Sequence, residues 1–142
     1  KNTIDIKGPK QIKSLNIIKT GEYPNFPTDM QAQFMVLLTK ANGKSIIQEN
    51  IFENRFMHVP ELKRLGAKIN IKGNKAIIDG NSNLEGAELM SSDLRASVAL
   101  VLAAFISKGT SIINRVYHLD RGYEKIENKL KKIGVKIKRI SS

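Results

Sequence analysis

One pattern of landmarks occurs twice along this chain of 142 residues. In each copy an Asp begins an apolar helical run, and an Arg follows in a loop farther along. Asp29 and Asp93 are 64 residues apart, and Arg55 and Arg121 are 66 residues apart. Self-similarity at a nearly fixed period is typical of repeat architectures, in which each repeat is one supersecondary unit. The sequence therefore predicts two copies of one folding unit.

Hydrophobic periodicity predicts the order β-α-β-α-β-β for this unit. Strands are expected where β-branched residues cluster or alternate with polar ones, and helices where apolar residues recur every three or four positions. Gly73-Asn74 is a hairpin signal between the last two strands. The first unit, residues 9–80, is predicted to hold strands at 15–19, 44–51, 67–71 and 76–79 and helices at 29–40 and 59–65.

The second unit, residues 81–142, repeats this order but lacks a hairpin partner for its last strand. Its predicted strands cover 87–90, 111–116 and 135–140, and its predicted helices cover 94–108 and 122–133. Residues 1–8 are interpreted as the last strand of a truncated preceding repeat, so we expect a C-terminal piece of a larger protein. The predicted fold class is α+β, with two mixed-sheet units that carry helices on one face.

Sequence signals also predict how the helices begin and which faces they bury. Thr28 and Ser92 are favourable N-cap residues, and Thr28 with Gln31 forms a capping-box pattern. The helix over 94–108 is apolar on nearly every side and is expected to be covered all round. The predicted buried face of the helix over 29–40 consists of Met30, Phe34, Leu37, Leu38 and Ala41.

The net charge of +11 admits two interpretations. A strongly basic balance is typical of proteins that bind a polyanion such as nucleic acid. Only six of the 24 basic residues are Arg, however, and aromatic residues, on which bases stack, make up 6% of the chain. A solvated, lysine-rich surface and no nucleic acid partner is therefore the favoured interpretation, with a basic nucleic-acid-binding module as the alternative.

Several classes of protein are disfavoured by what the sequence lacks. It has no Cys, so this chain forms no disulfide and offers no thiolate ligand. It shows no signal-peptide pattern and no run approaching the roughly 20 apolar residues of a membrane span, so we expect a cytoplasmic location and no membrane partner. His58 and His118 lack acidic residues at metal-ligand spacing, and no nucleotide-binding motif occurs. No metal and no cofactor are predicted.

Asp29 and Asp93 are candidate carboxylates for chemistry, because each stands in the first turn of a predicted helix. A negative charge there interacts favourably with the helix dipole, by about 0.3–1 kcal/mol. The alternative is a carboxylate that accepts a proton from a substrate hydroxyl. Spacing alone leaves both interpretations open.

Arg55, Arg95 and Arg121 stand at corresponding turns of a chain that otherwise favours Lys. Exposed ion pairs made by such residues contribute little to stability. A guanidinium, unlike an ammonium, binds carboxylate or phosphate through two parallel hydrogen bonds. If the two units pack by a repeat operation, these side chains and the two Asp gather at one end, where loops on a rigid scaffold usually carry function. The sequence therefore predicts a site for a small anionic molecule.

Four longer motifs contain these residues. They are FPTDMQAQ at 26–33, ENRFMH at 53–58, DLRA at 93–96 and HLDRGYE at 118–124. In this order they closely resemble the family of UDP-N-acetylglucosamine enolpyruvyl transferases, the 1-carboxyvinyltransferases of peptidoglycan synthesis. The resemblance extends over residues 13–140.

The resemblance implies the enolpyruvyl transferase fold, an inverted α/β barrel of two domains with three βαβαββ units each, of which this chain would supply two units. It also implies a reaction in which the enolpyruvyl group of phosphoenolpyruvate passes to the 3′-hydroxyl of UDP-N-acetylglucosamine. Addition to the alkene gives a tetrahedral intermediate, and elimination releases phosphate. Such a transferase serves peptidoglycan synthesis, and through it cell wall biogenesis, cell shape and cell division.

The same resemblance implies roles for particular residues. Asp29 is the candidate base that meets the sugar hydroxyl, and Arg121 is the second catalytic candidate. The guanidinium groups surround the carboxylate and phosphate of phosphoenolpyruvate, whereas residues 51–52 line the nucleotide-sugar pocket. The implied substrate-binding residues are Asp29, Ile51, Phe52, Arg55, Asp93, Arg95 and Arg121.

The chain also departs from the family pattern. The family's other domain carries a mobile loop with a reactive Cys or Asp and an early Lys-Asn pair, and Lys1-Asn2 is not that pair because a predicted strand follows it. We therefore expect half a site, no turnover by the isolated chain, and the missing N-terminal part of the enzyme as its partner. The related shikimate-pathway enolpyruvyl transferase is the alternative within the fold, and the motifs at 26–29 and 120–123 argue against it.

Overall fold

Two β-α-β crossovers organise the chain, each joining two short parallel strands through a helix. The computed structural model describes residues 3–140. The first crossover consists of β1 (Ile18–Lys19), the 3₁₀ turn η1 (Thr28–Met30), α1 (Gln31–Leu38) and β2 (Lys44–Gln48). The second consists of β5 (Glu88–Met90), α3 (Leu94–Ile106) and β6 (Ile112–Asn114). Parallel strands cannot be joined by a tight turn, so each pair depends on its helical connection.

A helix and a hairpin extend the first crossover. They are α2 (Val59–Arg64), β3 (Lys68–Lys72) and β4 (Lys75–Asp79). The resulting sheet has the order β1-β2-β4-β3, and β4 pairs antiparallel with both neighbours. Ala76 and Ile78 of β4 are buried while Lys75 is exposed, as expected for a sheet with one face on the core. Over residues 18–79 the element order is the predicted β-α-β-α-β-β.

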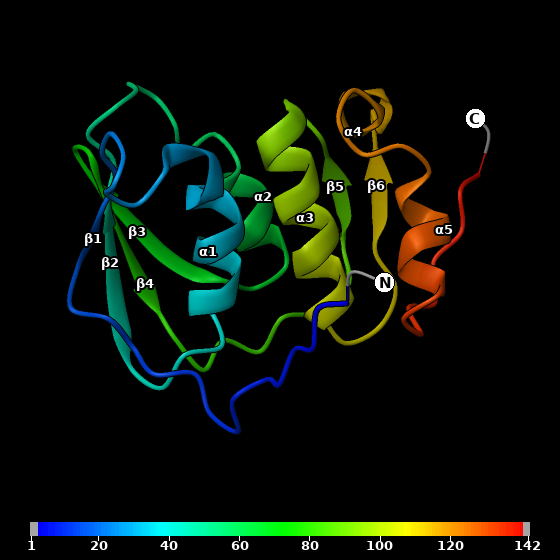
Figure 1. Ribbon diagram of the computed structural model, residues 1–142, viewed down its shortest axis with the longest axis horizontal. Coiled ribbons are helices and arrows are strands. Elements are labelled where there is room, and N and C mark those ends of the chain that lie inside the picture. The colour runs from blue at the N-terminus through cyan, green and yellow to red at the C-terminus, as the bar shows by residue number, and fades with distance from the viewer. Residues whose placement is uncertain (1–2, 141–142) are drawn as a thin grey trace.

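Two short helices follow the second crossover. They are α4 (Tyr117–Asp120) and α5 (Ile126–Lys131). Figure 1 shows the four-stranded sheet at one side of the molecule, α1, α2 and α3 in the middle, and β5, β6 and α5 at the other side. Helices and sheets thus form the α+β architecture that the sequence predicts.

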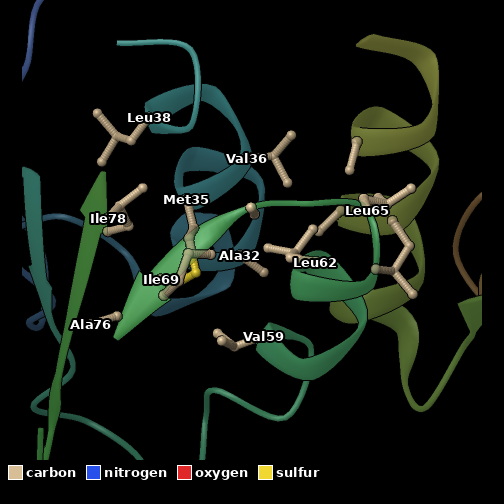
Figure 2. Close-up of a cluster of buried hydrophobic side chains, with 14 of the residues drawn as sticks. Ala32, Met35, Val36, Leu38, Val59, Leu62, Leu65, Ile69, Ala76 and Ile78 are labelled. Carbon is tan, nitrogen blue, oxygen red and sulfur yellow. The ribbon is translucent and has the colours of Figure 1, made fainter. Parts of the chain in front are cut away.

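The core lies between the four-stranded sheet and the central helices (Figure 2). Met35 of α1, Leu62 of α2 and Leu100 of α3 are almost completely buried. A smaller cluster, formed by Val98, Val101, Leu119 and Ile126, holds α4 and α5 against α3. Apolar contacts therefore run continuously from the first crossover into the second.

The predicted buried face of the first helix is confirmed in part, because Leu38 and Ala41 are buried and Phe34 packs against the core. Met30 and Leu37 are 48% and 41% exposed, whereas Gln31 and Ala32 are buried. The reason is that α1 packs against the sheet on one side and against α3 on the other. A helix covered on two sides does not follow the single-stripe pattern of a surface helix.

The predicted N-caps are also wrong. Asp93, not Ser92, caps α3, because its carboxylate accepts hydrogen bonds from the backbone N–H groups of Arg95 and Ala96. Thr28 makes no cap, since its hydroxyl donates instead to Glu49. Capping patterns identify helix starts but do not exclude a stronger tertiary partner for the same hydroxyl.

The terminal parts of the chain differ most from the prediction. Lys125, with φ 47°, adopts a left-handed conformation inside the helix predicted over 122–133, so that only α5 forms within this range, whereas α4 lies before it. Residues 135–140 and 4–7 do not form the predicted strands, because neither segment has a strand partner in the part of the chain that the structure describes. The ends of the predicted segments, residues 1–2 and 141–142, lie outside the described residues.

Among residues 3–140, no helix combines the length and apolar character needed to cross a bilayer. The same residues contain no group of three or more acidic or histidine side chains that could hold a metal ion.

Candidate active site

One end of the molecule collects the loops that carry the candidate residues. The carboxyl ends of β1, β2, β5 and β6 and the first turns of α1 and α3 all lie at this end, at the top of Figure 1. Crevices beyond the carboxyl ends of parallel strands are where such folds usually bind ligands. We call this end the rim.

Asp29 joins the two crossovers at the rim. Its carboxylate accepts a hydrogen bond from Arg95 Nε of α3 at 2.5 Å and lies 3.5 Å from Arg55 Nη2 of the loop after β2. The Asp29 side chain is 65% exposed, whereas those of Arg55 and Arg95 are 23% and 40% exposed. Two guanidiniums thus share one carboxylate, and the group keeps a net positive charge that faces solvent. Such an arrangement suits a small anion, because a guanidinium can bind a carboxylate or phosphate through two parallel hydrogen bonds.

Arg55 is held from several sides. Its Cζ lies 4.5 Å from the centre of the Phe52 ring, a cation–π contact, and its Nε lies 3.4 Å from Thr28 Oγ1. A surface depression of about 490 Å³ adjoins it, between the loop at 52–57 and the β3–β4 hairpin. The guanidinium is therefore fixed before any ligand arrives.

Asp93 fixes the second guanidinium. It caps α3 through the backbone N–H groups of Arg95 at 2.9 Å and Ala96 at 3.0 Å. The Arg95 side chain consequently leaves the helix within its first turn and points to Asp29. Asp93 and Asp29 occupy corresponding places in the repeat. Asp93 nevertheless accepts hydrogen bonds from backbone N–H groups, whereas Asp29 pairs with side chains.

Glu49 was not a candidate from the sequence, but it orders the loop after β2. It is 3% exposed and accepts hydrogen bonds from the hydroxyls of Thr20 and Thr28 and from the backbone N–H groups of Ile51 and Phe52. Ile51 and Phe52 themselves are 39% and 53% exposed. A charged residue at the end of a buried strand was the only sequence signal for this role, because its partners come from three separate segments.

Arg121 lies at the same end without joining the cluster. It follows α4 as the C-cap residue and is exposed. Among residues 3–140 no carboxylate forms an ion pair with it. The next residue, Gly122, lies against Leu94, since a Cβ there would stand 3.0 Å from both δ carbons of that side chain. Gly122 therefore places the turn that carries Arg121 beside Leu94 in the first turn of α3.

His58, which the sequence suggested only as a core or surface residue, is buried next to this end. It is 3% exposed, and its Nε2 has no hydrogen-bond partner within the described residues. Burial lowers the pKa of His58 to about 4, and the negative charge of Asp93 opposes that shift. The imidazole is therefore neutral at pH 7 and does not add to the positive charge of the rim.

Comparison with known proteins identifies the family of the chain. Residues 1–130 match the family described as EPSP synthase (3-phosphoshikimate 1-carboxyvinyltransferase). The chain belongs to the EPSP synthase family. The resemblance to carboxyvinyltransferases stated from the motifs is thereby confirmed.

Relatives within the EPSP synthase family are similar along almost the entire chain. The UDP-N-acetylglucosamine 1-carboxyvinyltransferase of Pelagibacter ubique is 67% identical over 141 residues, which are 99% of this chain and 34% of that protein. The protein of the same description from Campylobacter lari is 58% identical over 139 residues, which are 98% of this chain and 33% of that protein. The chain spans about a third of the length of these relatives.

Solved structures of the EPSP synthase family share the fold. The enolpyruvyl transferase NikO from Streptomyces tendae superposes with a TM-score of 0.86 at 28% identity, over 94% of this chain and 31% of that one. EPSP synthase from Acinetobacter baumannii gives a TM-score of 0.56 at 15% identity, over 75% of this chain and 24% of that one, and supports the fold alone. The predicted enolpyruvyl transferase fold is confirmed.

Proposed function

We propose that the protein containing this chain transfers the enolpyruvyl group of phosphoenolpyruvate to the 3′-hydroxyl of UDP-N-acetylglucosamine and releases phosphate. The observation that carries the proposal is the cluster of Asp29, Arg55 and Arg95 at the rim, formed by residues of both crossovers. The names and high identity of the relatives support this choice of substrates.

Each step of the reaction needs a group that the rim offers. The hydroxyl oxygen bonds to C2 of phosphoenolpyruvate while C3 gains a proton, which gives a tetrahedral intermediate. Loss of a C3 proton and of phosphate then restores the alkene in the product. Asp29 accepts the hydroxyl proton in this scheme, and Arg55, Arg95 and Arg121 bind the substrate carboxylate and phosphate. Fixed guanidiniums stabilise the charge that develops there.

The pairing of Asp29 with two Arg has a consequence for substrate binding. In the free protein the carboxylate balances part of the charge of Arg55 and Arg95. A phosphate or carboxylate that binds these guanidiniums competes with Asp29 and releases its oxygens toward the sugar hydroxyl. Binding of phosphoenolpyruvate thus frees the Asp29 carboxylate to act as the base. Ile51 and Phe52 contact the nucleotide sugar in this proposal.

The chain supplies only part of the site in this proposal. The proton donor to C3 and further cationic contacts would come from the remaining part of the enzyme, so the isolated chain should not turn over. In this proposal the product is a precursor of peptidoglycan, and the enzyme serves cell wall biogenesis in the cytoplasm. A phosphorylated shikimate acceptor is the second candidate, because the matching family carries that description.

The test measures phosphate release by the whole protein with either acceptor. Turnover is expected with UDP-N-acetylglucosamine and not with shikimate 3-phosphate. Asp29→Ala and Arg121→Ala should each lower kcat/KM by about 10²–10⁴-fold, the range for loss of a general base or a charge-stabilising group. Asp79→Ala and Arg64→Ala, which alter exposed ion pairs away from the rim, are the matched controls. Full turnover in both rim variants, or preference for the shikimate acceptor, would contradict the proposal.

A further inference from the structure

Arg139 and Asp120 form the most regular ion pair at this side of the molecule. Arg139 Nη1 donates to Asp120 Oδ2 at 2.8 Å, and Nη2 donates to Asp120 Oδ1 at 2.6 Å. Nη2 also donates to Glu127 Oε2 of α5 at 3.3 Å. Single exposed ion pairs stabilise little, but bidentate geometry and a shared third partner are the conditions under which such a pair restrains conformation.

The mutual effects on ionisation fit this geometry. The hydrogen bonds from Arg139 are the main cause that lowers the pKa of Asp120, and the two carboxylates raise the pKa of the guanidinium. The three groups therefore stay charged near neutral pH, and the pair weakens only when acid protonates the carboxylates.

Asp120 is the residue before Arg121, and Gly122 follows. The segment is fixed on its far side because Gly122 lies against Leu94 of α3. The backbone N–H groups of Gly122 and Tyr123 both donate to the carbonyl oxygen of Leu119. The backbone of Arg121 is thus held between an anchored carboxylate and a packed glycine.

Arg121 needs such an anchor more than the other two guanidiniums do. Arg55 contacts Phe52, Thr28 and Asp29, and Arg95 pairs with Asp29. Arg121 is exposed and forms no ion pair with a carboxylate among residues 3–140. The position of the Arg121 side chain must therefore be determined by the backbone of the turn that carries it.

We propose that Arg139 is a positioning residue, which holds the 117–123 turn through Asp120 and so aims Arg121 at the anionic substrate. Arg139 lies in a segment without secondary structure, beyond α5, and does not join the rim cluster. This inference rests on the proposed function, since it assigns Arg139 an effect on the binding of phosphoenolpyruvate. Loss of the bidentate pair between Arg139 and Asp120 should raise KM for phosphoenolpyruvate and leave KM for the nucleotide sugar unchanged.

The experiment compares the whole wild-type protein with Arg139→Lys and Arg139→Gln. Lys keeps the positive charge but cannot form the two parallel hydrogen bonds to Asp120, and Gln keeps neither. Both variants should therefore lose about 10-fold in kcat/KM for phosphoenolpyruvate, a typical loss for one displaced contact. Asp120→Asn should lose a similar factor, and Asp120→Asn with Arg139→Gln should lose no more than either alone, because residues of one network are not additive. Arg64→Ala, which removes an exposed pair on α2, is the matched control.

Two further measurements separate positioning from general stability. In an Arg121→Lys background, Arg139→Gln should cause no additional loss. Hydrogen exchange of the peptide over 117–123 should speed up in Arg139→Lys while other peptides stay protected. Wild-type kinetics in Arg139→Lys would overturn the inference, as would an equal loss in the Arg121→Lys background. A wild-type protein without any turnover would instead overturn the proposed function, and the kinetic role of Arg139 with it.

Discussion

Individual buried polar residues order the rim more than its exposed charges do. Glu49 accepts hydrogen bonds from the hydroxyls of Thr20 and Thr28 and from two backbone N–H groups of the loop at 51–52, and the residues next to it in the sequence do not identify the two threonines. His58 is as deeply buried, but its Nε2 is left without a partner among the described residues. An orphaned buried nitrogen is costly, and a charged one would be costlier still.

At the residue scale, His58 should make stability depend on pH. Its pKa is lowered to about 4 in the folded protein, so between pH 6.5 and 4 the unfolded chain binds a proton that the folded chain does not. Stability due to this group is therefore present above pH 6.5 and lost as the pH falls, by up to about 3 kcal/mol. Urea unfolding at pH 7 and pH 4 measures this loss.

The variant His58→Gln should lose less stability than the wild type over the same interval, whereas His118→Gln should follow the wild type. Carboxylates such as Asp120, whose pKa is also lowered, contribute equally to all three proteins and cancel in the comparison. An equal loss in His58→Gln and wild type would show that this histidine does not govern the acid response.

At the element scale, the helices in the middle of the molecule carry the packing. α1 contacts β2, β4 and α3, and α2 contacts β3, β5 and α3, so each helix has partners in the four-stranded sheet and in the second crossover. This double coverage explains why a polar residue, Gln31, is buried in α1 while Leu37 of the same helix is 41% exposed.

Two leucines on neighbouring helices should therefore respond differently to truncation. Leu62 of α2 is 0% exposed, and Leu62→Ala should destabilise the fold by about 2–5 kcal/mol through lost burial and a cavity. Leu37→Ala removes a half-exposed side chain and should cost less than about 1 kcal/mol. Chemical denaturation of the two variants checks this, and similar losses would mean that α1 and α2 are not packed as described.

At the scale of the whole molecule, the two crossovers contact each other in two places, the apolar core and the ion cluster at the rim. The core is apolar and continuous, whereas the Asp29 cluster is exposed and screened by solvent. Burial of the apolar core fixes how the two crossovers lie relative to each other. This arrangement brings charged side chains from both crossovers together in the Asp29 cluster.

This division predicts that the rim contributes to activity and hardly to stability. Asp29→Asn should change the free energy of unfolding by less than about 1 kcal/mol, because exposed ion pairs are worth little. The same substitution should abolish most of the proposed transferase activity. Thermal unfolding and phosphate release, measured on one preparation, test both statements. A large drop in the unfolding temperature would make Asp29 a structural residue.

The sequence by itself determined the element order of the first unit, the α+β class and the family. These follow from local periodicity, from turn residues and from motifs, all of which are written in consecutive residues. It also placed most elements of the first unit to within a few residues, because Gly and Pro punctuate that part of the chain.

Only the tertiary structure decided which residues meet. Asp29 pairs with Arg95, which is 66 positions away in the sequence. The Thr28 hydroxyl donates a hydrogen bond to Glu49 and does not cap a helix. Lys125 is left-handed and interrupts a helix that the apolar spacing over 122–133 favoured. Strands predicted at 4–7 and 135–140 did not form, because a strand exists only with a neighbour to pair with. The physical reason is the same throughout: local patterns state what a segment prefers, whereas hydrogen bonds and burial depend on what the fold brings beside it.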